Sequence, residues 1–373
     1  MLVSFVIPTR NRADEVAITL EAIGRLDADA LVAAGGAEVI VVDNASAAPV
    51  RTPRVLANGL PVERIRLRKN HAAAARNIGV DRARGVWVAM LDDDSHPTDT
   101  GFVRVLRDAP AEIGAIGAEI LLADGSHERG GLPEVFIGCG VCIRRDAFVR
   151  AGGYDAAFHF YAEEYDLAAR LMLAGLRITH DPRFRVVHRK VSAGRDMDAI
   201  LHRLVRNNGW VEERYAPADR RAFAIASTIE RYRAIAVKEG ATAGYEQGLA
   251  ELKRTLGSQP RREMSQALYD RFTGVAAARE RINAACALKP MRSVAIVEPG
   301  KNEWAVAQAV RERGIAIVTD PGLADGVVIG TLSPGPIADG VVRAERQHAG
   351  MRVIAPYGFA QIASEGLRIR RAA

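Results

Sequence analysis

The chain has 373 residues, enough for about two or three domains, and its composition (49% hydrophobic, 26% charged) excludes a wholly disordered, collagen-like or disulfide-dense protein. Its 51 basic and 45 acidic residues leave a net charge of +6, which suits an anionic partner such as a nucleotide, a phosphate or an acidic membrane surface. The N-terminus is typical of a first strand and not of a signal peptide. Apolar runs are too short for a membrane helix, and there are only three cysteines, so we expect a cytoplasmic protein.

The first hundred residues alternate short apolar runs with helical patterns. The apolar runs predict strands at residues 2–7, 38–42, 64–67 and 86–91. The helical patterns fall between them, at residues 13–26 and 71–84. Because strands that alternate with helices form βαβ units, we expect an α/β fold with a mostly parallel sheet flanked by helices.

Polar residues follow three of these predicted strands at the point where each strand ends. They are Pro8-Thr9-Arg10 after the first strand, Asp43-Asn44 after the second and Asp92-Asp93-Asp94 after the fourth. Ligands of parallel sheets bind beyond the carboxyl ends of the strands. The three segments therefore predict one common site.

The pattern changes twice after residue 100. Strands are predicted at 115–122, 135–143 and 184–187, a helix at 163–173, and a long polar helical stretch at 197–286. Lys289-Pro290 then breaks the chain, and strands again alternate with helices. We predict three parts: an α/β domain over residues 1–215, a helical region over 216–288 and a small Rossmann-like α/β domain over 289–373.

The strongest chemical signal is the aspartate triplet. An isolated acidic triplet is more often a solvated turn, but this one directly follows a hydrophobic strand, and adjacent like charges repel each other. Alternate residues of an extended segment point the same way, so Asp92 and Asp94 can together hold Mg²⁺ or Mn²⁺. Such an ion neutralises a departing diphosphate. His188 is a candidate third ligand, although a lone histidine at a strand end is more often structural.

Glu163 and Glu164 begin the predicted helix at 163–173. Acidic residues in a first helical turn often only complement the helix dipole. As a pair they can also supply a general base, because like-charge repulsion raises the proton affinity of a carboxylate. Cys139 and Cys142 have no second cysteine pair to complete a zinc site, and we expect them to be core residues.

Six segments in this order resemble the family 2 glycosyltransferases of the GT-A fold, over about residues 1–215. The segments are VIPTRNRADEV, VVDNAS, NHAAAARNIGV, LDDDSHP, GCGVCIRRDAFVRAGGYD together with YAEEYDLAARLMLAG, and RVVHRKVSAGR. The resemblance implies transfer of a sugar from a nucleotide-diphosphate sugar to a hydroxyl acceptor, with inversion. Nothing in it covers residues 289–373.

The resemblance also implies roles for particular residues. Glu164, beside Glu163, would be the general base. Asp92, Asp94 and His188 would bind Mn²⁺ or Mg²⁺. The donor would be held by Pro8, Thr9, Arg10, Asp43, Asn44, Arg76, Asn77, Asp92 and Asp93.

The sequence departs from the family's usual pattern. Glu164 stands where the family more often has Asp, and Ala72 and Ala73 stand where a glycine is usual. Asp43-Asn44-Ala45-Ser46 is similar to rhamnosyltransferase-type members, which favours a deoxythymidine-linked donor over a uridine-linked one. Two other functions stay open. A sugar nucleotidyltransferase would need a glycine-rich loop after the first strand, and a non-catalytic sugar-nucleotide-binding or scaffold protein would have lost its carboxylates.

The remaining expectations concern partners. The basic residues are scattered without interleaved aromatics, which argues against nucleic-acid binding. The acceptor could be a glycan, a metabolite or a lipid-linked sugar, and the last would bring peripheral contact with the inner face of the membrane. The strand-end turns of residues 289–373 carry no clustered acid, histidine or cysteine, so packing or self-association into a homo-oligomer is the expected role of this part.

Overall fold

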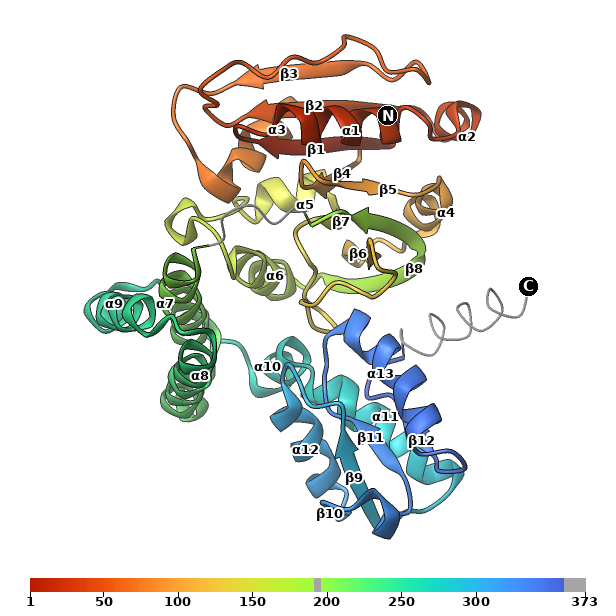
Figure 1. Cartoon of the computed structure of the whole chain (residues 1–373), viewed down its shortest axis with the longest axis vertical. Helices are drawn as coiled ribbons and strands as arrows, with labels where there is room; N and C mark the ends of the chain where they lie inside the picture. The colour runs from red at the N-terminus through yellow and green to blue at the C-terminus, as the bar shows by residue number, and fades with distance from the viewer. Residues whose placement is uncertain (191–195, 359–373) are drawn as a thin grey trace.

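The computed structural model describes residues 1–190 and 196–358. An eight-stranded mixed sheet with its helices comes first, followed by a group of helices and by a four-stranded parallel sheet (Figure 1). The predicted α/β class is therefore confirmed. The end of the RVVHRKVSAGR segment, residues 191–195, lies outside the described residues.

The large sheet has the strand order β3-β2-β1-β4-β7-β6-β8-β5. Its strands are β1 Val3–Thr9, β2 Ala37–Asp43, β3 Val62–Arg66, β4 Trp87–Leu91, β5 Ser95–Pro97, β6 Ile113–Leu122, β7 Gly140–Arg144 and β8 Arg177–His188. The first four strands of that order run parallel, whereas β7 is antiparallel to both β4 and β6. Thr9 pairs with Asp43, so β1 and β2 end at the same level.

Helices cover both faces of this sheet because its central strands are apolar on both sides. Val6 of β1 packs in one cluster with α3 and α6, while Phe5 packs in another with α1 and α4. The helices of this part are α1 Ala13–Ile23, α2 Ala28–Ala33, α3 Ala75–Arg82, α4 Gly101–Asp108, α5 Arg145–Arg150 and α6 Glu163–Leu173. With both faces covered, the carboxyl ends of β1, β2 and β4 are left for a ligand.

The rest of the chain contains a helical group and the small sheet. The helices are α7 Met197–Tyr215, α8 Ala218–Glu239, α9 Thr242–Thr255, α10 Gln266–Thr273, α11 Val275–Leu288, α12 Glu303–Glu312 and α13 Pro334–Gln347. The small sheet has the order β10-β9-β11-β12, with β9 Ser293–Val297, β10 Ala316–Val318, β11 Val327–Ile329 and β12 Val353–Ile354. Helices α7, α8 and α9 pack on one another, whereas α11 packs against α12 and β12.

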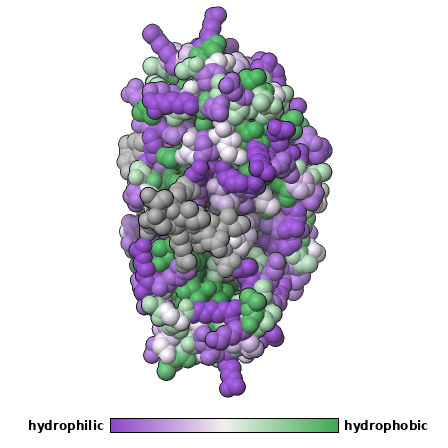
Figure 2. Space-filling model, turned by 90° about the vertical axis from the view of Figure 1, so that its right-hand side faces the viewer, coloured by the Kyte–Doolittle hydropathy of each residue, from purple (hydrophilic) through white to green (hydrophobic). Residues whose placement is uncertain are grey.

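The surface carries its apolar side chains in separate places. On the face shown in Figure 2, hydrophilic side chains are abundant and hydrophobic ones lie between them in patches. Exposed large apolar residues occur on different elements, such as Ile18 on α1 and Phe223 on α8, which is ordinary for a protein surface. Among the helices of the described residues, none combines the length and the hydropathy needed to span a membrane.

The small sheet docks on the first domain through the loops at its strand ends. Ser333, which precedes α13, exchanges hydrogen bonds with the backbone of Gly130. The small sheet also contacts the helical group, since the Asn302 amide donates to the carbonyl of Thr273 in α10 at 2.8 Å. The edge at which ligands bind in open α/β sheets therefore faces the rest of the chain.

A buried histidine also joins the two parts. His127 Nδ1 lies 2.8 Å from Asp339 Oδ1 on α13, and its Nε2 lies 3.4 Å from Glu119 Oε1 on β6. Burial lowers the pKa of His127, but the two carboxylates outweigh burial and raise this pKa to about 9. At neutral pH, His127 is therefore a cation shared by two acids.

Replacing this histidine should destabilise the protein in a pH-dependent way. His127→Gln is expected to lower the free energy of unfolding at pH 6 by about 3 kcal/mol, because the buried Glu119 and the partly buried Asp339 lose their cation. The stabilising charge is fully present below the unfolded-state pKa of about 6.5 and is lost as the pH rises through about 9. Urea denaturation at about pH 6 and about pH 9.5 measures both effects.

Arg343→Gln is the matched control for this prediction. Arg343 pairs with Glu298 on the surface of the same part of the chain, so its loss should cost less than about 1 kcal/mol at either pH. An equal loss for His127→Gln at the two pH values would contradict the assigned charge of His127.

Candidate active site

Two cavities meet at the carboxyl ends of β1, β2 and β4. The first, about 510 Å³, is lined by Pro8, Thr9, Arg10, Asn11, Arg12, Asn44, Asn70, Ala72, Asp93 and Asp94 together with the shared residues below. The second, about 460 Å³, is lined mainly by Glu128, Arg129, Cys139, Tyr154, Tyr161, Glu163 and Glu164. Both cavities contact Arg76, Asp92, Phe160, His188 and Lys190. Most of the predicted strand-end residues thus line the first cavity, and the predicted glutamate pair lines the second cavity next to it.

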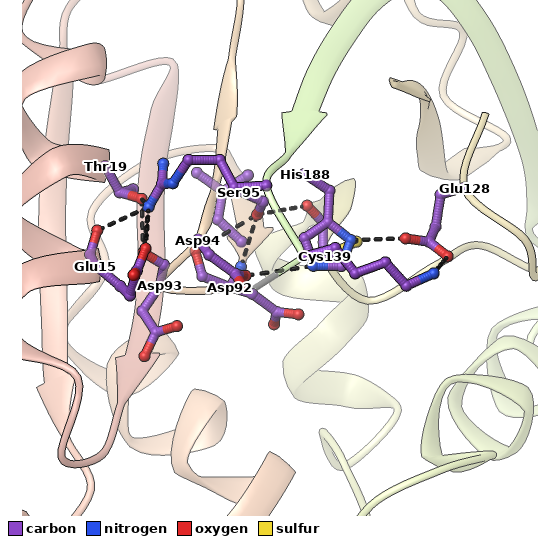
Figure 3. A network of polar contacts seen from close by, with 12 residues as sticks. Glu15, Thr19, Asp92, Asp93, Asp94, Ser95, Glu128, Cys139 and His188 are labelled. Atoms are coloured by element: carbon purple, nitrogen blue, oxygen red, sulfur yellow. Dashed lines mark hydrogen bonds and ion pairs between the residues drawn. The ribbon is translucent and has the colours of Figure 1, made fainter. Parts of the chain in front are cut away.

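Asp93 and Asp94 lie buried in a network of polar contacts (Figure 3). Arg12 connects them, because its Nη2 donates to Asp94 Oδ2 at 2.7 Å and its Nε lies 3.1 Å from Asp93 Oδ1. Thr9 Oγ1 also donates to Asp93 at 2.8 Å. Burial raises the pKa of Asp93 to about 6. Burial also acts on Asp94, but hydrogen bonds from His188 and Arg12 outweigh it and hold the pKa of Asp94 well below its usual range.

Asp92 is placed differently from its two neighbours. Its side chain is 41% exposed and forms an ion pair with the buried guanidinium of Arg76. The turn is held by Ser95, whose Oγ accepts from the Asp92 N–H and donates to the carbonyl of Cys139, both at 2.8 Å. Asp92 therefore presents an accessible carboxylate at the boundary of the two cavities.

His188 reaches the triplet because β8 pairs with β5. Ser95 lies opposite His188 in that pairing. The imidazole contacts Asp94 through Nε2 at 3.3 Å and Glu128 through Nδ1 at 2.8 Å. Burial lowers the pKa of His188, but these acidic neighbours and Cys139 outweigh it and raise this pKa to about 12. Lys190 Nζ lies 2.8 Å from the other oxygen of Glu128.

One group of side chains could hold a metal ion. Ligand atoms of Asp92, Cys139 and His188 lie within 4.8 Å of one another. Burial raises the pKa of the Cys139 thiol to about 11, so this sulfur is protonated at neutral pH. A hard cation such as Mg²⁺ or Mn²⁺ takes carboxylate oxygens in preference to a thiol. Donor chemistry thus favours a carboxylate over Cys139, but Asp94 is not part of this compact group, so the set of Asp92, Asp94 and His188 stays a prediction.

Glu163 and Glu164 begin α6, and both are partly buried where they line the second cavity. One carboxylate oxygen of Glu163 is buried without a hydrogen bond. Burial raises the pKa of both residues, and the charge of Glu164 raises that of Glu163 further, well above its usual value. The two carboxylates repel each other, so the pair carries one negative charge more readily than two and can take up one proton.

The loop before α6 is held in a strained conformation. His159, Tyr161 and Ala162 have φ of 64°, 71° and 64°, in the left-handed region that side chains disfavour. The buried amide of Asn207 on α7 donates to three carbonyls of this loop, at residues 158, 160 and 161, at 2.7–2.9 Å. Helix α7 thus fixes the loop that precedes the glutamate pair.

Two predicted donor-binding residues do not line either cavity. Asp43 is fully buried and accepts from the backbone N–H groups of Ser46 at 2.9 Å and Val50 at 3.1 Å. The Asn77 amide makes two hydrogen bonds to the backbone of Tyr154. Both residues shape the loops around the site and do not face it. Asn44 does line the first cavity, while its amide also bonds to the backbone of residues 71 and 72.

Sequence reasoning missed several residues of the site. Arg12, Glu128, Lys190 and Asn207 carry its charges and fix its loops. Arg12 lies in the first predicted segment, two residues beyond Arg10, and its charge was a usable signal. Glu128 and Asn207 follow no strand end and belong to no segment of the resemblance, so they have no such signal.

Known proteins resemble the first part of the chain. Residues 4–117 match the family described as Glycosyl transferase family 2. An uncharacterized glycosyltransferase of Haemophilus influenzae is 28% identical over 202 residues, which are 46% of this chain and 62% of that protein. The pre-mycofactocin glycosyltransferase of Mycobacterium tuberculosis is 28% identical over 210 residues, or 50% of this chain and 42% of that protein. The chain thus spans less than two thirds of these relatives.

Two solved structures align with more of the chain at low identity. Staphylococcus aureus TarS 1-349 in complex with UDP-GlcNAc is 15% identical, with 84% of this chain and 93% of that chain covered and a TM-score of 0.48. The mannosyltransferase PcManGT from Pyrobaculum calidifontis, in complex with GDP-Man and Mn²⁺, is 16% identical, with 84% and 86% covered and a TM-score of 0.44.

Proposed function

We propose that this chain, whose residues 4–117 belong to glycosyl transferase family 2, transfers a sugar from a nucleotide-diphosphate sugar to a hydroxyl acceptor with inversion at the anomeric carbon. Two adjoining cavities that meet at Asp92 carry this proposal. One contains the aspartate triplet and several cations, and the other contains a partly buried glutamate pair. A reaction between two substrates needs pockets that hold both within reach of each other.

The first cavity suits the donor. It lies beyond the carboxyl ends of parallel strands, where nucleotides bind in open α/β sheets. Arg10, Arg12, Arg76 and Lys190 line it, and their charges suit a diphosphate. Asn44 and Thr9 add uncharged polar groups for the nucleoside.

A divalent cation fits the boundary between the cavities. Asp92, Asp94 and His188 would hold it, with His188 giving up its proton when the ion binds. When bound, Mn²⁺ or Mg²⁺ supplies a Lewis acid that neutralises charge on the departing diphosphate. Glu128 accepts from His188 Nδ1 and so orients the imidazole toward the aspartates.

The second cavity suits the acceptor and its activation. Glu164 would accept the proton of the acceptor hydroxyl as the oxygen attacks the anomeric carbon from the side opposite the diphosphate. Glu163 would stay protonated beside Glu164, so that the pair carries only one negative charge. Partial burial raises the pKa of Glu164, which makes its carboxylate a stronger base.

A donor screen tests the proposed function. With Mn²⁺ present, the matching nucleotide sugar among UDP-, dTDP- and GDP-sugars should raise the melting temperature, because a ligand that binds the folded state stabilises it. The same donor, given hydroxyl acceptors, should release free nucleoside diphosphate. Release of pyrophosphate would instead indicate a sugar nucleotidyltransferase. Binding of a donor without turnover of any acceptor would favour a non-catalytic sugar-nucleotide-binding protein.

A further inference from the structure

The C-terminal part of the chain places one cation at the start of α6. Lys301 lies in the turn between β9 and α12, and its Nζ is 4.4 Å from the centre of the Tyr165 ring. Tyr165 directly follows Glu164 in the first turn of α6 and is 8% exposed. A cation over a desolvated aromatic ring is attracted to it. Lys301 therefore contacts α6 beside the glutamate pair.

The turn that carries Lys301 is fixed on both sides. The Leu332 N–H donates to the carbonyl of Lys301 at 2.8 Å. Asn302, the next residue, has φ of 56° and donates through its amide to Thr273. A left-handed conformation at a non-glycine residue persists only where its surroundings hold it. The lysine side chain thus starts from a rigid backbone.

The charges near this side chain point to Glu164 as its partner. Glu164 stabilises the charged form of Lys301, whereas burial and Arg231 oppose it, and the pKa of Lys301 falls to about 8. In return, Lys301 lowers the pKa of Glu164 against the effect of burial. Lys301 is still mostly charged at neutral pH.

The other groups around Glu164 do not replace this cation. Glu163 is its neighbour on α6, and Tyr154 and Tyr232 face it as neutral phenols. Arg76 on α3 also acts on Glu164, but its guanidinium pairs with Asp92.

We infer that Lys301 is a positioning residue for Glu164, which fixes the start of α6 through Tyr165 and favours the charged carboxylate next to it. The inference rests on the proposed function, in which Glu164 is the general base of the transfer. Residues 289–373 would then take part in the chemistry of the first domain and not only in packing.

Lys301→Met and Lys301→Arg test this role. Loss of the positive charge should raise the pKa of Glu164 and move the acid limb of the kcat/KM profile to higher pH by about one unit. The rate of Lys301→Met at about pH 6 should then fall up to about tenfold, with little change near pH 9. Lys301→Arg should restore the wild-type profile. Arg343→Met, which removes an exposed cation of the same part of the chain, should leave the profile unchanged.

A measurement that needs no turnover separates this inference from the proposed function. The carboxyl ¹³C shift of Glu164, assigned by its loss in Glu164→Gln, reports the pKa of Glu164 directly. A higher pKa in Lys301→Met supports the inference even if no acceptor is turned over. Equal pKa values in folded wild type and Lys301→Met, with thermal unfolding as the check of folding, would overturn it. Identical kcat/KM profiles against pH for wild type and Lys301→Met would also overturn the inference, while the proposed transferase function would stand.

Discussion

Glu164→Gln is expected to lower kcat by about 10³-fold, within the usual range for loss of a general base, and to leave donor binding nearly unchanged. The amide keeps the size of the side chain but cannot accept the proton of the acceptor hydroxyl. Glu164 lines the second cavity and is not among the residues of the first. Steady-state kcat, with calorimetric binding of the nucleoside diphosphate, measures the two effects separately.

Glu163→Gln is the matched control, because it makes the same chemical change one residue away. The pKa of Glu163 lies well above its usual value, so an amide resembles the protonated acid that is already there. We expect Glu163→Gln to retain much more activity than Glu164→Gln. If Glu163→Gln were the more damaged variant, the two glutamates would have to exchange roles.

Asp94→Asn is expected to lower kcat/KM by about 10²-fold or more, with the loss appearing in the dependence on Mn²⁺. The change removes a buried negative charge that lies between Arg12 and His188. Without that charge, the site would lose a proposed ligand of the divalent cation, and Arg12 would lose its buried partner. Titration of activity with Mn²⁺, and of nucleoside diphosphate affinity at fixed Mn²⁺, measures the effect.

Two variants show whether that effect is specific. Asp99→Asn breaks the ion pair between Asp99 and Arg185, neither of which lines a cavity. This variant should show the same dependence of activity on Mn²⁺ as the wild type. Cys139→Ala should keep it as well, because the buried thiol is protonated at neutral pH. A strong Mn²⁺ defect in Cys139→Ala would assign the metal to the group of Asp92, Cys139 and His188.

The centre of the large sheet was predictable from the sequence because β1, β2 and β4 are largely apolar runs, whereas the charged β3 is a weaker signal. The same rule brought the strand-end residues together: Thr9, Arg10 and the aspartate triplet line one cavity. The rule could not say which strand-end side chains face inward. Asp43 follows its strand as predicted, but its carboxylate closes a turn through the N–H groups of Ser46 and Val50.

Other features needed tertiary contacts that local patterns do not encode. Helices α2, α4 and α5 have six to eight residues, too few to repeat a helical period clearly. Residues 135–139 were predicted as the first half of a strand at 135–143, because they are mostly apolar. In the structure, only Gly140–Arg144 pairs in the sheet. A single bridge between Leu132 and Val135 turns the chain there instead. Glu128 comes to His188 from that same irregular segment.

The hold of Asn207 on the loop before α6 has a consequence for synthesis of the protein. Residues 1–190 contain the aspartate triplet, the glutamate pair and His188, but the loop at 158–162 depends on an amide that is made later. The residues of the first cavity therefore all precede α7, and of these only Phe160 lies in the loop that Asn207 fixes, whereas the second cavity also needs Met197 and Ile200 of α7. We expect a nascent chain on the ribosome to bind a sugar nucleotide before it can transfer the sugar. Transfer has to wait until enough chain has emerged for α7 to dock.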